Sequence, residues 1–367
     1  MINLRRHIYS PAFILLTLLL SSCRKDLCYN HFRSLKVHLE YEQVWERDYG
    51  INTADIWDTE LYGLTYDELI PEACESVTVL IYDVNDEKSI RTDFIYQTDT
   101  RDLSIGDGVN SVLFYNNDTE NVTSRSITDR KNAQCVANLA SRSTYVPMDG
   151  DEITVLEPDM CYTAYLSEIP EISMHEQRGV IVKMQPIVFT YVFVFEFDSG
   201  IDNVALARGA ISGMAYGAYY RDASTTEETA TILFENCKIV DNEIVAIVRA
   251  FGPPNFVVTY YEGPVPDHVS RNTDSRSRSR ARSRADGDNG DTGTQRLNLE
   301  LMLTSGRIKE VYFNVSNQIN KNPTGGIVHF TGLKVDDSEN VGSSLFNVDV
   351  QGWGEAEEIP LPVTPSR

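Results

Sequence analysis

Histidine and cysteine are scarce in this chain, and neither follows the spacing of a catalytic or metal-binding motif. The six histidines form no H-x-x-x-H or H-E-x-x-H pattern. The six cysteines include no C-x-x-C pair, so a zinc ribbon is not indicated. A G-x-S-x-G nucleophile elbow and a phosphate-binding glycine loop are also missing. These absences give no support to a catalytic triad or a metal site, although residues far apart in the chain could still assemble one in space. An enzyme is therefore the least favoured class of protein.

The apolar run near the N-terminus is too short to span a membrane. Residues 12–20 are almost unbroken apolar and follow two arginines, whereas a membrane span needs about 20 such residues. This pattern is typical of a secretory signal peptide. Leu20-Ser21-Ser22-Cys23 resembles the bacterial lipobox, which predicts removal of residues 1–22 and acylation of Cys23. Each buried methylene of such acyl chains contributes about 0.8 kcal/mol, so a stable membrane attachment is expected.

Residues 23–33 then form a short polar tether. Once Cys23 is acylated, five cysteines remain, and an odd number cannot all pair within the chain. They are Cys28, Cys74, Cys135, Cys161 and Cys237. Because they are widely scattered, we expect most to be buried as small apolar residues, with one or two disulfides left open.

Basic residues are far fewer than acidic ones. The chain has 32 basic against 54 acidic residues and a formal net charge of −22. Such a surface repels phosphates and anionic headgroups, which argues against nucleic acid as a partner. The Ser/Arg-rich stretch at 270–295 has no interleaved aromatic residues, and its low complexity predicts a disordered loop.

Long helical periods are also lacking, whereas short segments of alternating apolar and polar residues recur along the chain. Turn-forming clusters rich in Gly, Asn and Asp separate them. The expected strands are 35–41, 77–83, 92–97, 109–115, 162–166, 187–197, 232–234, 244–248, 256–261, 297–303 and 311–315. Strands at this frequency indicate an all-β sandwich architecture.

The strongest strand, 187–197, is apolar on both faces and should lie at the centre of a sheet. The chain is longer than one hydrophobic core usually organises, so we expect two domains. Their boundary is placed near 170–179, where polar residues interrupt the apolar pattern, giving an N-terminal sandwich at 34–175 and a C-terminal one at 180–367. The glycine-rich stretch 208–220 is interpreted as a strand or loop, and 52–75 as a connection with a short helix near 67–72.

Trp45 and Trp57 lie among acids and turns, where they could stack on a carbohydrate. The competing interpretation is that they fill a sandwich core, as aromatic residues often do. A surface glycan-binding protein that uses these two side chains is therefore an alternative function.

A resemblance to a known group begins at SVTVLIYDV, the segment that starts at Ser76. It continues through IRTDFIYQ, Gly106-Asp107-Gly108 and SVLFYNNDTE. With the lipobox and the start of a second sandwich at Gln185-Pro186-Ile187, the layout is similar to that of Bacteroidales fimbrillin-like lipoproteins, a group that includes fimbrial anchor and minor subunits and an uncharacterised sister family.

This resemblance implies two transthyretin-like (immunoglobulin-like) β-sandwich domains in tandem and an outer-membrane lipid anchor at the cell surface. It also implies no catalytic residues and no cofactor. It further implies assembly with other fimbrial β-sandwich subunits in cell adhesion, by strand exchange in the family's pilins. The expected function is that of a non-enzymatic surface lipoprotein, a fimbrial anchor or minor fimbrial subunit.

Overall fold

The structure, a computed structural model, describes residues 33–41, 57–62, 65–69, 74–83, 89–96, 100–105, 110–140, 152–169, 179–257, 265–266, 295–337, 347–352 and 355–357. Strands dominate these ranges, and the helical elements are only three to six residues long. These are α4 (Thr59–Tyr62), α5 (Ser316–Lys321) and the 3-10 turns η1 (Tyr66–Leu69) and η2 (Ile201–Asn203). The all-β fold class predicted from the sequence is confirmed.

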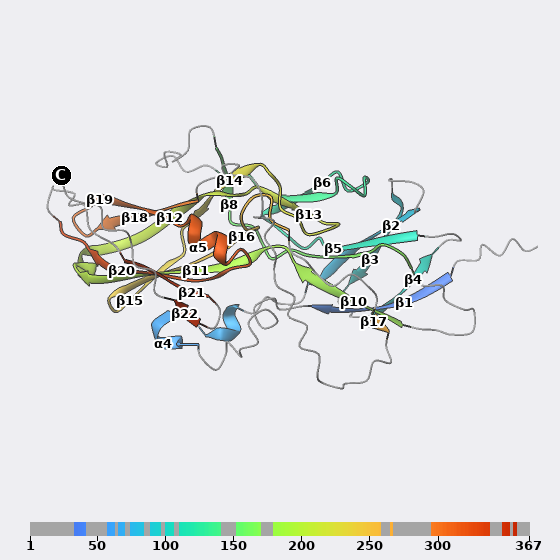
Figure 1. The fold of residues 1–367 in the computed structure, drawn as a ribbon, viewed down its shortest axis with the longest axis horizontal. Coiled ribbons are helices and arrows are strands. Elements are labelled where there is room, and N and C mark those ends of the chain that lie inside the picture. Colours follow the sequence, from blue (N-terminus) through green and yellow to red (C-terminus); the bar gives the residue numbers. More distant parts are fainter. Residues whose placement is uncertain are drawn as a thin grey trace, which may run out of the picture.

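The largest sheet is rolled so that its two outer strands meet. Its spatial order is β3 (Ser89–Tyr96), β2 (Ser76–Asp83), β5 (Asn110–Asn116), β9 (Tyr162–Leu166), β10 (Gly179–Pro186), β1 (Arg33–Tyr41) and β4 (Thr100–Ile105), with β17 (Val265–Pro266) paired to β10. Alternate residues such as Val37, Val79 and Phe114 pack together inside it. Asp93 on β3 pairs with Arg101 on β4 at 3.0 Å. We call this the first sheet, and Figure 1 shows it at one end of the molecule.

Two further sheets lie at the other end. The six-stranded sheet has the order β15 (Cys237–Val240), β16 (Glu243–Ala250), β11 (Phe189–Ser199), β20 (Gly326–Lys334), β21 (Asn347–Gly352) and β22 (Glu355–Glu357). The five-stranded sheet has the order β19 (Ile308–Asn314), β18 (Arg296–Leu303), β12 (Val204–Ala215), β14 (Thr229–Phe234) and β8 (Ile153–Leu156). β11 is flanked by β16 and β20, which confirms that the strand expected at 187–197 is central.

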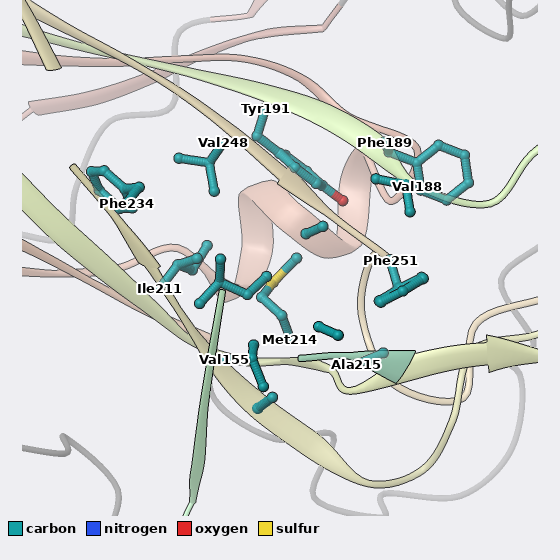
Figure 2. Packing of buried hydrophobic residues seen from close by; sticks show 14 of the residues in the cluster. Val155, Val188, Phe189, Tyr191, Ile211, Met214, Ala215, Phe234, Val248 and Phe251 are labelled. Carbon is teal, nitrogen blue, oxygen red and sulfur yellow. The ribbon is translucent and has the colours of Figure 1, made fainter. Parts of the chain in front are cut away.

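The inner faces of these two sheets form one aromatic-rich core. Phe195 of β11 stacks on Phe330 of β20 with ring centroids 4.8 Å apart. Figure 2 shows Tyr191 on the side of the six-stranded sheet and Ile211 and Met214 facing it from β12. The alternation of large apolar residues along β11 therefore does what its sequence predicts: one set of side chains fills the space between two sheets.

Strand pairing crosses the boundary that we expected between residues 175 and 180. β10 lies beyond that boundary, yet Val180 pairs with Val37 of β1 and Gln185 with Thr163 of β9, so β10 is part of the first sheet. β8 lies before the boundary and pairs in parallel with β14 in the five-stranded sheet. Local hydrophobic patterns identify strands but carry no information about distant partners, so the division into domains at 34–175 and 180–367 stays a prediction.

The two ends of the molecule share a continuous core. On β2, Val79 and Ile81 face the interior of the first sheet, whereas Leu80 and Tyr82 join the core of the other end. A small sheet of β13 (Gly217–Tyr219), β7 (Gln134–Ala137) and β6 (Val122–Arg125) contributes to the same contact. The glycine-rich stretch at 208–220 thus forms strands β12 and β13. The short helix expected near 67–72 corresponds to η1, which begins one residue earlier.

Candidate functional site

Trp57 covers the outer face of the six-stranded sheet. Its ring lies 4.3 Å from that of Tyr62 on α4 and 5.9 Å from that of Tyr66 on η1, measured between centroids. Both tyrosines are buried against aliphatic side chains that point outward from the sheet, namely Val192, Val194, Val245 and Ile327. Figure 1 shows α4 beside this sheet. This cover explains why β11 is apolar on both faces, and it leaves Trp57 partly buried.

A group of carboxylates lies beside this aromatic cover. Glu243 of β16 is opposite Glu196 of β11. Burial, followed by repulsion from Glu196 and Asp58, raises the pKa of Glu243 to about 7. Burial and the charges of Asp58 and Glu243 raise the pKa of Tyr62 to about 12. Glu243 thus carries a proton through part of the neutral pH range, and this proton limits repulsion among the acids.

No three His, Cys, Asp or Glu side chains in the described ranges are arranged to hold a metal ion. The four cysteines within them, Cys74, Cys135, Cys161 and Cys237, are present as thiols. Cys135 and Cys161 are buried in the main core, as expected for small apolar residues. In the described part of the chain, no helix is long and apolar enough to cross a membrane.

Two of the three predicted site residues cannot be placed. Cys23 and Trp45 lie outside the described residues, as do residues 1–22, the tether to residue 32 and most of the 270–295 stretch. Their proposed roles stay predictions. The fold brings Trp57 close to Tyr62 and Tyr66, beside the carboxylates around Glu243. The sequence did not predict this cluster.

The outer face of the five-stranded sheet exposes an apolar row near its β19 edge. Cross-strand pairing aligns Leu206 of β12 with Met302 of β18, and Met302 with Ile308 of β19. Their exposed fractions are 62%, 37% and 53%, which is high for large aliphatic side chains. The next row of the same face contains Arg208, whose Nε donates a hydrogen bond of 2.6 Å to Glu300. We refer to Leu206, Met302 and Ile308 as the β19 row.

β19 is the last strand of its sheet. It pairs with β18 on one side, and no described strand pairs with it on the other. Lysine at such an edge often discourages a further strand. Here the ammonium of Lys309 is held by the carboxylate of Asp336 at 3.0 Å. The first part of β19 therefore combines an open edge with an exposed apolar row. The sequence alone did not reveal either feature, because its alternation there is the same as in any half-buried strand.

Part of the chain matches a known protein family, and its fold is similar to those of solved structures. Residues 66–235 match a family described as Domain of unknown function (DUF5119). A protein from Bacteroides ovatus, proposed to be an adhesin, has a similar structure: TM-score 0.52, 19% identity, 84% of this chain and 94% of that chain. The resemblance to Bacteroidales fimbrillin-like proteins predicted from the sequence is thus confirmed as a likeness of fold.

Two other solved structures are more distant. One represents proposed polysaccharide-binding proteins from Bacteroides thetaiotaomicron, with a TM-score of 0.46, 10% identity, and coverage of 89% of this chain and 98% of that chain. The other is the fimbrial anchor protein Mfa2 from Porphyromonas gingivalis, with a TM-score of 0.44, 9% identity, and coverage of 89% and 99%. No curated protein matches this chain in sequence.

Proposed function

We propose that this chain is a non-enzymatic adhesion protein of the cell surface, a fimbrial anchor or minor subunit that assembles with other β-sandwich subunits. In this proposal the chain is built as two transthyretin-like sandwiches and is held at the outer membrane by a lipid on Cys23. The observation that carries the proposal is the open β19 edge with its exposed apolar row.

An edge strand and an adjoining apolar surface suit a β-sandwich partner. A partner strand can add its backbone hydrogen bonds to the open edge at Ile308–Val311, and its side chains can cover the β19 row. Covering three large aliphatic side chains removes apolar surface from water, which is the main favourable contribution to association. A small soluble ligand would not use the backbone edge.

The N-terminal segment supports a membrane-proximal location. A short signal-like run ending in Cys23 predicts a lipid anchor, and the net charge of −22 keeps the folded body away from anionic headgroups. The chain would then stand off the membrane on its tether, with the sheet edges available to partners.

The glycan-binding alternative at Trp45 and Trp57 receives less support. The ring of Trp57 contacts Tyr62 and Tyr66 and helps to cover β11 and β16, so its contribution to packing accounts for its position. A sugar could stack only on the part of the ring that this packing leaves exposed.

The test uses the full-length chain, tagged and purified in detergent from outer membranes of its own host cells. We expect β-sandwich subunits to co-purify, and Ile308→Lys to reduce their recovery at least about tenfold because a charge must then be buried at the contact. Leu139→Lys is the matched control, since Leu139 is 68% exposed and lies outside the β19 row. Equal recovery with both variants would refute the assembly surface. Enzymatic activity in the purified chain would refute the non-enzymatic role.

A further inference from the structure

A pair of exposed aromatic rings lies on β3, far from Trp57 along the chain. Phe94 is 37% exposed and Tyr96 is 56% exposed, whereas Ile95 between them is buried in the first sheet. The rings are stacked, with centroids 6.0 Å apart and planes inclined by 28°. Among the described residues, the other exposed aromatic side chain is Tyr312 on β19, which has no exposed aromatic neighbour of this kind. Exposed apolar side chains that lie together on a surface can mark a binding site.

The position of these rings follows from strand alternation. Thr92, Phe94 and Tyr96 share the outer side of β3, and Phe94 and Tyr96 lie opposite Thr78 and Ser76 of β2. Thr92 is exposed and Ser76 is partly exposed. The pair of rings is thus bordered by hydroxyl groups along the strand and by a hydroxyl group on the neighbouring strand.

The edge of β3 is closed to a partner strand. β3 and β4 meet where the first sheet rolls, and the carboxylate of Asp93 pairs with the guanidinium of Arg101 at 3.0 Å across this junction. Because β4 itself contacts β3 at this junction, a strand from another protein would have to displace β4 to reach the backbone of β3. The rings therefore do not serve an edge-addition contact like the one proposed for β19.

The chemistry of the surface selects its ligand. Aromatic faces carry partial negative charge and attract weakly positive groups such as the C–H bonds on one face of a pyranose ring. Hydroxyl groups of Tyr96, Thr92 and Ser76 can exchange hydrogen bonds with sugar hydroxyls. The net charge of −22 disfavours uronate, sulfate and phosphate groups on the same ligand.

We propose that Phe94 and Tyr96 form a binding platform for a neutral polysaccharide, with one sugar ring on the outer surface of the aromatic pair. The platform lies on a different sheet from the β19 row, so this site stands or falls separately from the proposed assembly function.

The test measures binding of the full-length chain, in detergent, to an array of neutral and uronate-bearing polysaccharides, followed by isothermal titration with the glycan that binds best. We expect a neutral glycan to bind, and the double variant Phe94→Ala/Tyr96→Ala to bind at least about tenfold more weakly. Tyr96→Phe keeps the ring and should retain most of the affinity. Tyr312→Ala removes a ring of similar exposure, 54%, and should change the affinity less than about twofold.

Other occupants give different results. If two copies of the chain meet through these rings, light scattering will show a dimer that the double variant converts to a monomer, and the glycan proposal is overturned. Binding only to uronate-bearing polysaccharides, no binding to any neutral glycan, or equal loss with Tyr312→Ala would also overturn it. If no β-sandwich subunits co-purify with the wild-type chain but the glycan still binds, the assembly function alone is overturned. Circular dichroism of each variant checks that the fold is retained.

Discussion

Replacing Glu157 with glutamine should stabilise the protein increasingly as pH rises. Glu157 follows β8, and its Oε1 accepts a hydrogen bond of 3.2 Å from the backbone N–H of Arg249 on β16. Burial is the main cause that raises the pKa of Glu157 to about 7 from its ordinary 4.5; Arg249 opposes this rise and Asp159 adds to it. The glutamine keeps an oxygen that can accept the same hydrogen bond, but it never carries the buried negative charge.

The direction follows from the two protonation states. In the unfolded chain the carboxyl ionises near pH 4.5, whereas in the folded chain it holds its proton until about pH 7. Between these values the unfolded state loses its proton first, so stability falls as pH rises and then levels off above pH 7. The raised pKa corresponds to at most about 3 kcal/mol, and partial contact with water reduces the expected loss to about 1–2 kcal/mol.

The assay is urea unfolding of the wild-type chain and Glu157→Gln at pH 5, 6, 7 and 8. The free energy of unfolding of the variant, relative to wild type, should increase by about 1–2 kcal/mol across this range. Glu227→Gln, at an exposed position before β14, is the control and should change the free energy of unfolding by less than about 0.5 kcal/mol. A constant or decreasing advantage of Glu157→Gln would refute the reasoning.

Three further predictions concern the anchor, the core and a close backbone contact. Cys23→Ala should abolish acylation and release the chain from membranes in a fractionation assay; a variant that stayed acylated and bound would disprove the anchor. Phe330→Ala removes a ring that packs on three other phenylalanines and should lower the free energy of unfolding by about 3–5 kcal/mol in urea. Gly209→Ala would place its Cβ 2.4 Å from the carbonyl oxygen of Asn298 and 2.2 Å from the ring of Phe234. We therefore expect a clear fall in the melting temperature. An unchanged melting temperature would contradict the close packing of β12 against its neighbours.

The sequence predicted some strands from the alternation of their side chains, but β10 was not predicted although its buried and more exposed residues alternate. The central position of β11 followed from its two apolar faces, and β9 was predicted with its bounds. β4, β6 and β7 are short or polar on one side, and their alternation is too weak to stand out. Pairings such as β1 with β10 depend on residues far apart in the chain, which a local pattern cannot reveal.

The candidate surfaces were harder to predict than the strands. Trp57 is flanked by acids in sequence, which suggested exposure, but the chain folds back so that its ring lies against Tyr62. Phe94 and Tyr96 sit in a regular alternating strand, and such a pattern does not show which of the two faces meets solvent. Exposure there depends on how far the neighbouring sheet extends over β3, a property of the whole fold.

The place of β10 in the first sheet has a consequence for the order of folding. β10 lies between β9 and β1, and it joins the pair β1–β4 to the remaining strands. Until residue 186 has emerged from the ribosome, the N-terminal strands lack the neighbour that closes their core. Early chain segments must therefore wait with apolar surface uncovered, and such late, long-range pairing is slow and prone to aggregation. A chaperone that shields β1 and β4 would act in the interval before β10 arrives.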